Sequence, residues 1–278
     1  MFRNEACYLD EWIRFHELMG IEHFFLYDHI STDDPLSRLE PYIKAGLVTV
    51  MDWPIAIKNE AQQKAYQHCL DNFGETSRWI AFIDLDEFLF SPHRKLNDTL
   101  RDYEAYCAVV VHWQCYGSSG HRARPDGLVT DNYLYRAKTN WVRNRRVKSV
   151  VDPDRTVSPM GPHFFEFTDQ ALPVNENHKP VTVRKLRRPT RFINKIMART
   201  GLFFGYFPAD PYAVRAINSE DPCVDVFRIN HYTVKSYEDY TNKITKNKKK
   251  RFNQVFFIYH DRNEVYGPVL KGSIKLDS

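Results

Sequence analysis

The sequence contains few cysteines and no long hydrophobic run. Its five cysteines are an odd number, and no two of them form a CxxC pair, which excludes a disulfide framework and the common zinc-binding patterns. Unpaired cysteines are typical of a reducing compartment. No apolar run approaches the roughly 18 residues that a membrane-spanning helix needs, and the first residues do not resemble a signal peptide. These absences lead us to expect a cytoplasmic location.

The charges nearly balance. The net charge is +4 and the pI is about 8.7, which is too weakly basic to indicate a nucleic-acid partner but suits an anionic small molecule or membrane surface. Most of the excess lies in residues 184–191 and 243–251. Each run is either a solvated face or a contact surface for an anionic membrane, here the inner membrane, or for a glycan. The densest group comprises Lys246, Lys248, Lys249, Lys250 and Arg251.

Short apolar segments alternate with helical patterns over residues 1–90. Strands with no polar alternation are buried on both faces, which is typical of a parallel sheet with helices on both sides. We therefore expect an α/β fold with a mainly parallel central sheet, in which residues 1–2 are the last piece of a truncated first strand. The further strands are predicted at 23–27, 47–51 and 79–83, and the helices at 5–19, 35–45 and 60–73.

The second half of the chain is less regular. The length of 278 residues suits one domain, 1–278. Residues 184–222 are rich in arginine, proline and aromatic residues and give no prediction. Elsewhere we expect strands at 108–113, 146–151 and 163–167, a short helix at 130–137 and a longer one at 237–250.

Polar clusters follow three of the predicted strands, at residues 3–5, 28–34 and 84–87. Ligands of such sheets bind at the carboxyl ends of the strands, so we expect the three clusters to converge. Asp84 and Asp86 follow a very apolar strand, and two carboxylates at this spacing can bind one hard cation such as Mn²⁺ or Mg²⁺. The alternative is a helix cap, for which Asp-x-Asp also serves.

Three other residues have two interpretations each. Asp28 and Asp33 could accept hydrogen bonds from a base or a ribose hydroxyl of a nucleotide, or they could form Asx-turns and cap a helix. Lys148 alternates with apolar residues in its strand, so it is either a phosphate ligand in a cleft or a surface lysine with a buried stem.

Seven segments together resemble glycosyltransferase family 92 and its bacterial relatives of the family 2-like type. In chain order they are RNEACYLDEWIRFHELMGIEHFFLYDHISTDD, WIAFIDLDEFLF, HWQCYGSSGH, VKSVV, PHFF, INHYTVKSYEDY and FFIYHDRNEVY. The resemblance implies a GT-A (Rossmann-like) fold, an inverting mechanism, manganese, and a UDP-sugar donor with galactose favoured. It also implies a nucleotide-sugar-binding half at 1–90 and an acceptor-binding half at 91–278.

The resemblance assigns roles residue by residue. Asn4 and Glu5 match the turn after the first strand, where Arg3 replaces the usual lysine, and Asp28 matches the nucleotide-side aspartate. Asp84 and Asp86 match the metal motif. The loop expected to line the sugar or acceptor pocket comprises Trp113, Gly117, Ser118, Ser119, Gly120 and His121, and the later motifs include Lys148, His163, His231, Tyr232 and Lys235.

The third metal ligand and the catalytic base stay open. His163 is our first prediction for the third ligand, with His231 as the alternative, because imidazole is an acceptable manganese ligand. An inverting transfer needs a carboxylate base. The candidates are Asp126, Asp131, Glu166 and Glu176, among which spacing does not choose.

Two other functions are compatible with the sequence. Paired aspartates also serve metal-dependent nucleotidyl- and phosphotransferases, and an inactive glycosyltransferase-like domain could bind glycans. The expected partners are a UDP-sugar and a glycan or lipid-linked acceptor, without nucleic acid.

Overall fold

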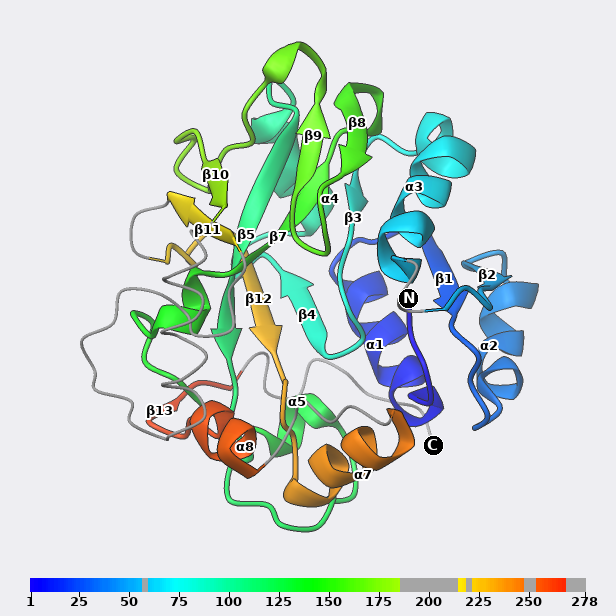
Figure 1. Cartoon of the computed structure of the whole chain (residues 1–278), viewed down its shortest axis with the longest axis vertical. Helices are drawn as coiled ribbons and strands as arrows, with labels where there is room; N and C mark the ends of the chain where they lie inside the picture. The colour runs from blue at the N-terminus through cyan, green and yellow to red at the C-terminus, as the bar shows by residue number, and fades with distance from the viewer. Residues whose placement is uncertain (57–59, 186–214, 219–221, 248–253, 269–278) are drawn as a thin grey trace.

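The computed structural model describes residues 1–56, 60–185, 215–218, 222–247 and 254–268 (Figure 1). Basic residues 186–191 and 248–251, and most of the stretch 184–222 that gave no prediction, lie outside these ranges. The helices are α1 Ala6–Leu18, α2 Pro35–Lys44, α3 Ala61–Phe73, α4 Leu96–Leu100, α5 Val129–Asn132, α7 Tyr237–Asn247 and α8 Gln254–His260.

The strands form one larger sheet and several strand pairs. β3, β7, β5, β12 and β4 form a five-stranded sheet in that order. β1 and β2 form a separate parallel pair, and Phe2 bridges Asp28 in parallel beside it. The strands are β1 Phe24–Asp28, β2 Val48–Asp52, β3 Ile80–Ala81, β4 Glu87–Phe90, β5 Ala108–Cys115, β6 Tyr135–Arg136, β7 Val147–Val151, β8 Thr156–Pro159, β9 Phe165–Phe167, β10 Thr182–Lys185, β11 Arg215–Asn218, β12 Arg228–His231 and β13 Val265–Tyr266.

The mixed α/β architecture agrees with the sequence prediction, but a mainly parallel sheet is not confirmed. Within the five-stranded sheet only the pairing of β12 with β5 is parallel, whereas β3 and β5 pair with β7, and β12 pairs with β4, in antiparallel fashion. The parallel arrangement expected of residues 1–90 is limited to Phe2, β1 and β2. The prediction failed because continuous burial, which β5 and β7 show along their whole length, does not fix strand direction.

The first helix forms as its pattern predicts. The side chains of Leu9, Trp12, Ile13 and Phe15 are buried on one face of α1, and Gly20, at a positive φ of 95°, ends the turn that follows it. The buried His16 Nε2 accepts a hydrogen bond from the Leu89 N–H of β4 at 3.0 Å. α1 therefore packs against β4 and fixes its position.

Some predicted elements are shorter or of another type. The strand expected at 79–83 is the two-residue β3, and the helix expected at 130–137 is the single turn α5 followed by β6. α7 ends at Asn247 within the described residues. None of the helices in the described ranges is both long enough and apolar enough to cross a bilayer.

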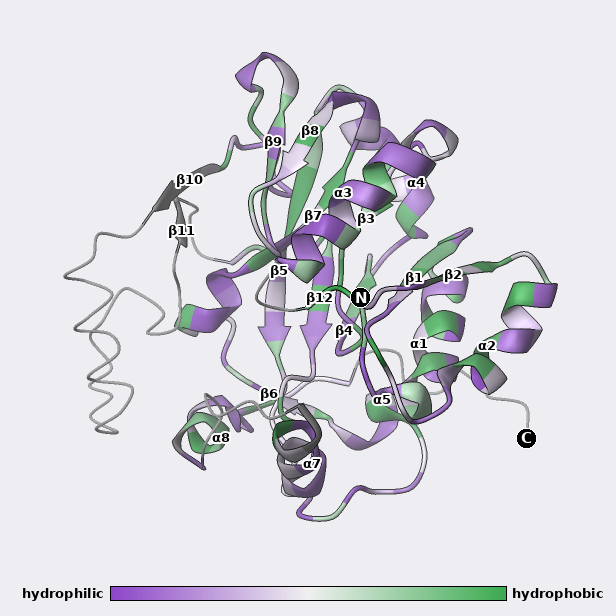
Figure 2. Cartoon of the chain, turned by 45° about the vertical axis from the view of Figure 1, so that its right-hand side comes forward, coloured by the Kyte–Doolittle hydropathy of each residue, from purple (hydrophilic) through white to green (hydrophobic). Residues whose placement is uncertain are grey.

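The polar ends of two neighbouring strands mark one end of the larger sheet. Figure 2 colours the final residues of β5 and β12 hydrophilic, and these two strands run in parallel with His231 opposite Cys115. In Figure 1, α7 and α8 lie beyond this end. The carboxyl ends of β5 and β12 thus face residues from the last part of the chain.

Candidate active site

The segment between β3 and β4 carries Asp84 and Asp86. The Glu87 N–H donates to the Asp84 carbonyl at 3.0 Å, and the Asp84 N–H donates to Glu87 Oε2 at 3.0 Å, which closes a turn. Trp12 Nε1 of α1 donates to the Glu87 carbonyl at 2.8 Å and holds this turn on the helix. Both aspartates line a pocket of about 300 Å³. Its other charged or titratable lining residues include Arg3, Glu5, Arg143, Arg146, His231 and Lys243.

Asp84 is fixed by two residues from outside its own segment. Gln62 Nε2 of α3 donates to Asp84 Oδ1, and Lys148 Nζ of β7 donates to Asp84 Oδ2, each at 2.9 Å. Lys148 also lies 3.5 Å from Glu87 Oε2, and both of these side chains are fully buried. Burial alone would raise the pKa of Asp84, but the ammonium of Lys148 lowers it. Lys148 is therefore neither a solvent-exposed lysine nor part of the pocket lining. Its ammonium group balances the negative charge of the Asp84 carboxylate from beneath the pocket.

Asp86 is bound by residues that lie more than 140 positions away in the sequence. Lys243 Nζ of α7 donates to Asp86 Oδ2 at 2.7 Å and lies 3.6 Å from Glu5 Oε1. The Tyr232 N–H donates to the Asp86 carbonyl at 2.8 Å. Burial alone would raise the pKa of Asp86, but Lys243 and the neighbouring His231 hold it well below its ordinary value. Asp86 is therefore ionised at neutral pH and ready to interact with a cation.

The two candidate histidines differ in position. His231 Nε2 is 3.6 Å from Asp86 Oδ1 and 3.1 Å from Thr233 Oγ1, and its ring lies 4.1 Å from that of Trp113. His163 Nδ1 is 3.0 Å from the Val147 carbonyl, and its ring packs on Trp113 at 5.4 Å. Burial lowers the pKa of both histidines, so both are neutral at pH 7. Of these two candidates, His231, the alternative in our sequence prediction, is the one that lines the pocket with Asp86.

The residues predicted for the nucleotide side interlock with one another. The Asn4 N–H donates to Ser31 Oγ, and the Ser31 N–H donates to Asp28 Oδ1, both at 3.0 Å. The Ala6 N–H at the start of α1 donates to Asp33 Oδ2 at 2.9 Å. These contacts match the turn-and-cap interpretation of Asp28 and Asp33, and a nucleotide contact for either stays a prediction. Glu5 is the predicted nucleotide-side residue that lines the pocket.

The loop predicted to line the acceptor pocket is fixed by the last motif of the chain. The Ser118 N–H donates to Asp261 Oδ1 at 2.6 Å, and the Ser119 N–H donates to Asn263 Oδ1 at 2.8 Å. A Cβ on Gly117 would lie 2.5 Å from the Arg262 carbonyl oxygen, so this position requires glycine. Trp113 is buried, the Gly120 N–H donates to Ser118 Oγ, and His121 Nε2 is 3.2 Å from the Asn132 carbonyl. The two motifs form one structural unit outside the lining of the aspartate pocket.

The candidate bases lie elsewhere. Asp126, Asp131 and Glu166 are exposed and are not among the residues that line the aspartate pocket. Glu176 is buried, and its carboxylate accepts hydrogen bonds from three successive backbone N–H groups, at residues 225–227. These bonds make Glu176 a structural anchor for residues 225–227, and a role as the base stays a prediction. The described carboxylates that line the pocket are Glu5, Asp84 and Asp86.

Several residues of this site did not emerge from the sequence. Gln62 gave no signal, and Lys243 was counted only as the first residue of a basic run. Glu87 was counted only as the last residue of the polar cluster 84–87, although a third acidic residue directly after an apolar strand is a signal that could have been used. Gln62 and Lys243 were missed because their roles depend on contacts between distant segments.

The comparison with known sequences decides the family. The profile of glycosyltransferase family 92 matches residues 1–198. The chain belongs to glycosyltransferase family 92. The match includes β1 to β10 and the aspartate motif, while His231 and Lys243 lie beyond it.

Family 92 relatives from plants are similar over part of their length. A family 92 protein from Oryza sativa subsp. japonica is 32% identical over 160 residues, which cover 55% of this chain and 26% of that protein. One from Arabidopsis thaliana is 29% identical over 173 residues, or 58% of this chain and 29% of that protein. A galactan β-1,4-galactosyltransferase of Arabidopsis thaliana is 28% identical over 108 residues, or 35% and 21%. The similarity thus spans less than a third of these relatives.

Proposed function

We propose that this family 92 protein is an inverting glycosyltransferase of the GT-A type, which transfers a hexose from a UDP-sugar to a hydroxyl group of a glycan or lipid-linked acceptor. Galactose is the favoured sugar, because related proteins of Arabidopsis thaliana are named as galactan galactosyltransferases. The observation that carries the proposal is the pocket of about 300 Å³ in which Asp84 and Asp86 face several basic side chains.

The charges of the pocket suit a nucleoside diphosphate. Arg3, Arg143, Arg146 and Lys243 contribute positive charge to its lining, and guanidinium groups are well suited to phosphate oxygens. When the sugar leaves, negative charge grows on the diphosphate, and cations placed beforehand around it lower the free energy of that transition state. The basic side chains would therefore both bind the donor and stabilise the leaving group.

A divalent cation fits the donor atoms of the pocket. No group of three His, Cys, Asp or Glu side chains in the described ranges lies close enough to hold a metal ion by itself. Mg²⁺ and Mn²⁺ at phosphate sites commonly use one or two carboxylates and take further ligands from phosphate and water. Asp86 and Asp84 would supply the carboxylates and His231 an imidazole nitrogen. Once bound, such a cation would neutralise charge on the diphosphate.

Two further features complete the proposal. Residues 1–90 would contribute mainly to the donor site and residues 91–278 mainly to the acceptor site. Lys243 is an exception, because it reaches the donor side from the second half.

We also propose a cytoplasmic location in which a lipid-linked acceptor would bring the enzyme into peripheral contact with an anionic membrane. The catalytic base would come from Asp126, Asp131, Glu166 or the pocket residue Glu5.

The test combines ligand binding with one conservative substitution. Thermal shifts are measured with UDP, GDP, CMP and the nucleoside triphosphates, each with and without manganese, because a ligand that binds the native state raises the melting temperature. We expect UDP with manganese to give the largest shift. Asp86→Asn should lose both this shift and donor hydrolysis, whereas the exposed Asp71→Asn on α3 should retain both. Equal UDP affinity in excess chelator would refute the proposed metal dependence of UDP binding. A response to triphosphates alone would favour a nucleotidyl- or phosphotransferase.

A further inference from the structure

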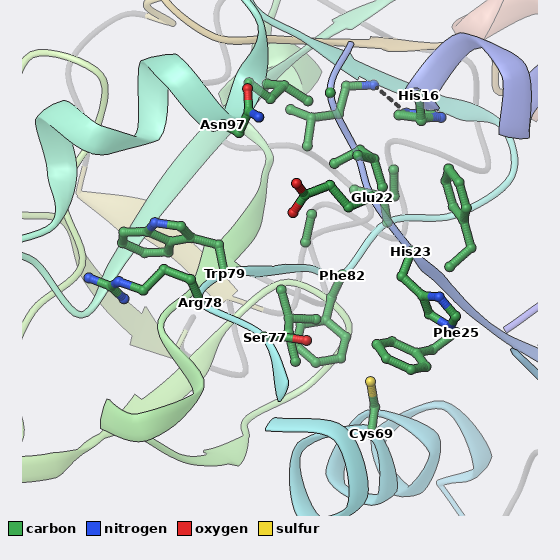
Figure 3. Close-up of a pocket in the computed structure, with 18 of the residues that line it drawn as sticks. His16, Glu22, His23, Phe25, Cys69, Ser77, Arg78, Trp79, Phe82 and Asn97 are labelled. Atoms are coloured by element: carbon green, nitrogen blue, oxygen red, sulfur yellow. Dashed lines mark hydrogen bonds between the residues drawn. The ribbon is translucent and has the colours of Figure 1, made fainter. Parts of the chain in front are cut away.

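Two further cavities differ in the chemistry of their lining. The larger, of about 390 Å³, lies between β1 and β3 and is lined mainly by apolar side chains (Figure 3). Figure 3 shows Phe25, Phe82 and Cys69 turned toward one another in it, while the guanidinium of Arg78 points away. The smaller, of about 40 Å³, is lined mainly by polar and charged side chains, several of them from α7. The smaller cavity is therefore the one suited to a polar ligand.

The smaller cavity lies beside the aspartate pocket. Glu5, Thr233 and Lys243 line both spaces. Lys243 Nζ lies 3.6 Å from Glu5 Oε1, so this ion pair forms part of the wall that the two spaces share. A group bound in the smaller cavity would lie next to a donor in the aspartate pocket without taking its place.

Lys235 contributes a buried ammonium group to the smaller cavity. The residue is 4% exposed and lines this space. Its Nζ lies over the ring of Tyr8, 4.3 Å from the centroid, and within the part of the chain that the structure describes this ammonium has no hydrogen bond and no ion pair. An aromatic face attracts a cation, but a buried charge is normally paired with an opposite charge as well.

The carboxylates around Lys235 are engaged elsewhere. Asp239 pairs with Arg124, and Glu5 is the carboxylate beside Lys243. Burial and the charge of Lys243 lower the pKa of Lys235, and the surrounding carboxylates do not offset these two effects. The protein thus leaves the positive charge of Lys235 without a matching negative charge, which an anionic ligand could supply.

The backbone holds this ammonium in place. Lys235 has a φ of 51°, a left-handed conformation that residues other than glycine rarely adopt. The next two residues are fixed by distant groups, because the Ser236 N–H donates to Tyr133 Oη at 3.1 Å and the Tyr237 N–H donates to the His121 carbonyl at 3.2 Å. The position of Lys235 is therefore set by tertiary contacts rather than by its own conformational preference.

We propose that the smaller cavity binds one oxyanion group of the acceptor, a carboxylate or a phosphate, with Lys235 as its ligand. Its volume is room for roughly three water-sized spheres, which suits one such group and excludes a second nucleotide. Asn4 and Asn242 also line it and carry amide groups that can donate hydrogen bonds. The proposal rests on the proposed function: if the donor fills the aspartate pocket, an anion beside it belongs to the other substrate. The enzyme would then select acceptors that carry an acidic group near the accepting hydroxyl.

The test measures phosphate binding while the aspartate pocket is filled. Melting temperatures are recorded with saturating UDP and Mg²⁺, with phosphate or with NaCl at the same ionic strength. We expect phosphate, but not NaCl, to raise the melting temperature of the wild-type chain by about 3 °C. Lys235→Met should lose this shift, and the exposed Lys138→Met should keep it. A wild-type chain without the shift, or a Lys235→Met variant that keeps it, would overturn the proposal.

The same titration without nucleotide separates this proposal from the proposed function. If UDP does not bind at all, the proposed function fails. A phosphate shift that Lys235→Met alone abolishes would still establish the anion site. Competition between UDP and phosphate in the wild-type chain would instead place the phosphate in the aspartate pocket and overturn the second site.

Hydrogen exchange covers the case in which Lys235→Met does not fold. With UDP and Mg²⁺ present, phosphate should slow amide exchange within residues 233–239 of the wild-type chain by about tenfold, and unchanged exchange there would contradict the proposal. Glucuronic acid and glucose 6-phosphate then distinguish a carboxylate from a phosphate as the natural group, with glucose as the neutral control. We expect one of the two acidic sugars to bind at least about tenfold more tightly than glucose. Equal affinity for all three would refute an anion site.

Discussion

Lys148 provides the sharpest test of how the aspartate segment is held. Its ammonium lies 2.9 Å from Asp84 Oδ2 and 3.5 Å from Glu87 Oε2, and the side chains of Lys148 and Glu87 are 1% and 0% exposed. Lys148→Met keeps a long, unbranched side chain and removes the charge. We expect it to destabilise the fold, because Glu87 would remain buried without a counter-charge.

The magnitude follows from the two partners. Removing one member of a buried ion pair costs about 3–5 kcal/mol of unfolding free energy. Asp84 is 35% exposed, so water screens its charge and the Lys148–Asp84 ion pair contributes little to the loss of unfolding free energy. We therefore expect a loss near the lower end, about 3 kcal/mol at neutral pH. Lys148→Met combined with Glu87→Gln should recover part of it, because the uncompensated charge is then gone.

The loss should depend on pH in a defined direction. Burial raises the pKa of Glu87 well above its ordinary value, and without Lys148 that pKa should rise further. Between the pKa of the unfolded chain and this raised pKa, the folded state binds more protons than the unfolded state, so stability falls as pH rises. Lys148→Met should consequently be less destabilised at pH 5 than at pH 8.

Urea unfolding at both pH values measures these effects, with the exposed Lys138→Met as the matched control. A loss below about 1 kcal/mol, the range of a surface ion pair, would show that the buried pair is not what holds this segment. A loss that is the same at pH 5 and pH 8 would refute the role assigned to Glu87.

Three other predictions concern separate parts of the protein. Lys243→Gln should weaken UDP binding about tenfold in calorimetry, the equivalent of about 1.4 kcal/mol; unchanged affinity would exclude it as a phosphate ligand. Gly117→Ala should lower stability by about 1–3 kcal/mol in urea unfolding through overpacking against Arg262, and a neutral result would mean that the loop shifts freely. Glu176→Gln should lower the unfolding free energy by about 3 kcal/mol, because it weakens the hydrogen bonds to the backbone N–H groups of 225–227. The donor-hydrolysis rate per folded molecule should not change. A variant that is stable but inactive would instead favour Glu176 as the catalytic base.

The sequence was sufficient for several local elements of the first half. The 3.6-residue pattern of α1 and the apolar strands at β1 and β2 depend on neighbouring residues, and the structure confirms these three elements. The aspartate motif and the resemblance to family 92 were also readable, because they rest on residue types in a fixed order. The family profile confirms the family.

Only the tertiary structure decided which distant residues meet. Strand direction in the larger sheet could not be read from burial, because a continuous apolar strand such as β5 fits parallel and antiparallel partners equally well. The sequence favoured His163 over His231, whereas of these two histidines it is His231 that lines the pocket. It also offered no reason to place Lys243 on Asp86 across 157 positions. These contacts depend on how α7 and β12 fold back over the aspartate segment, and that geometry is set by packing between elements, which no local pattern encodes.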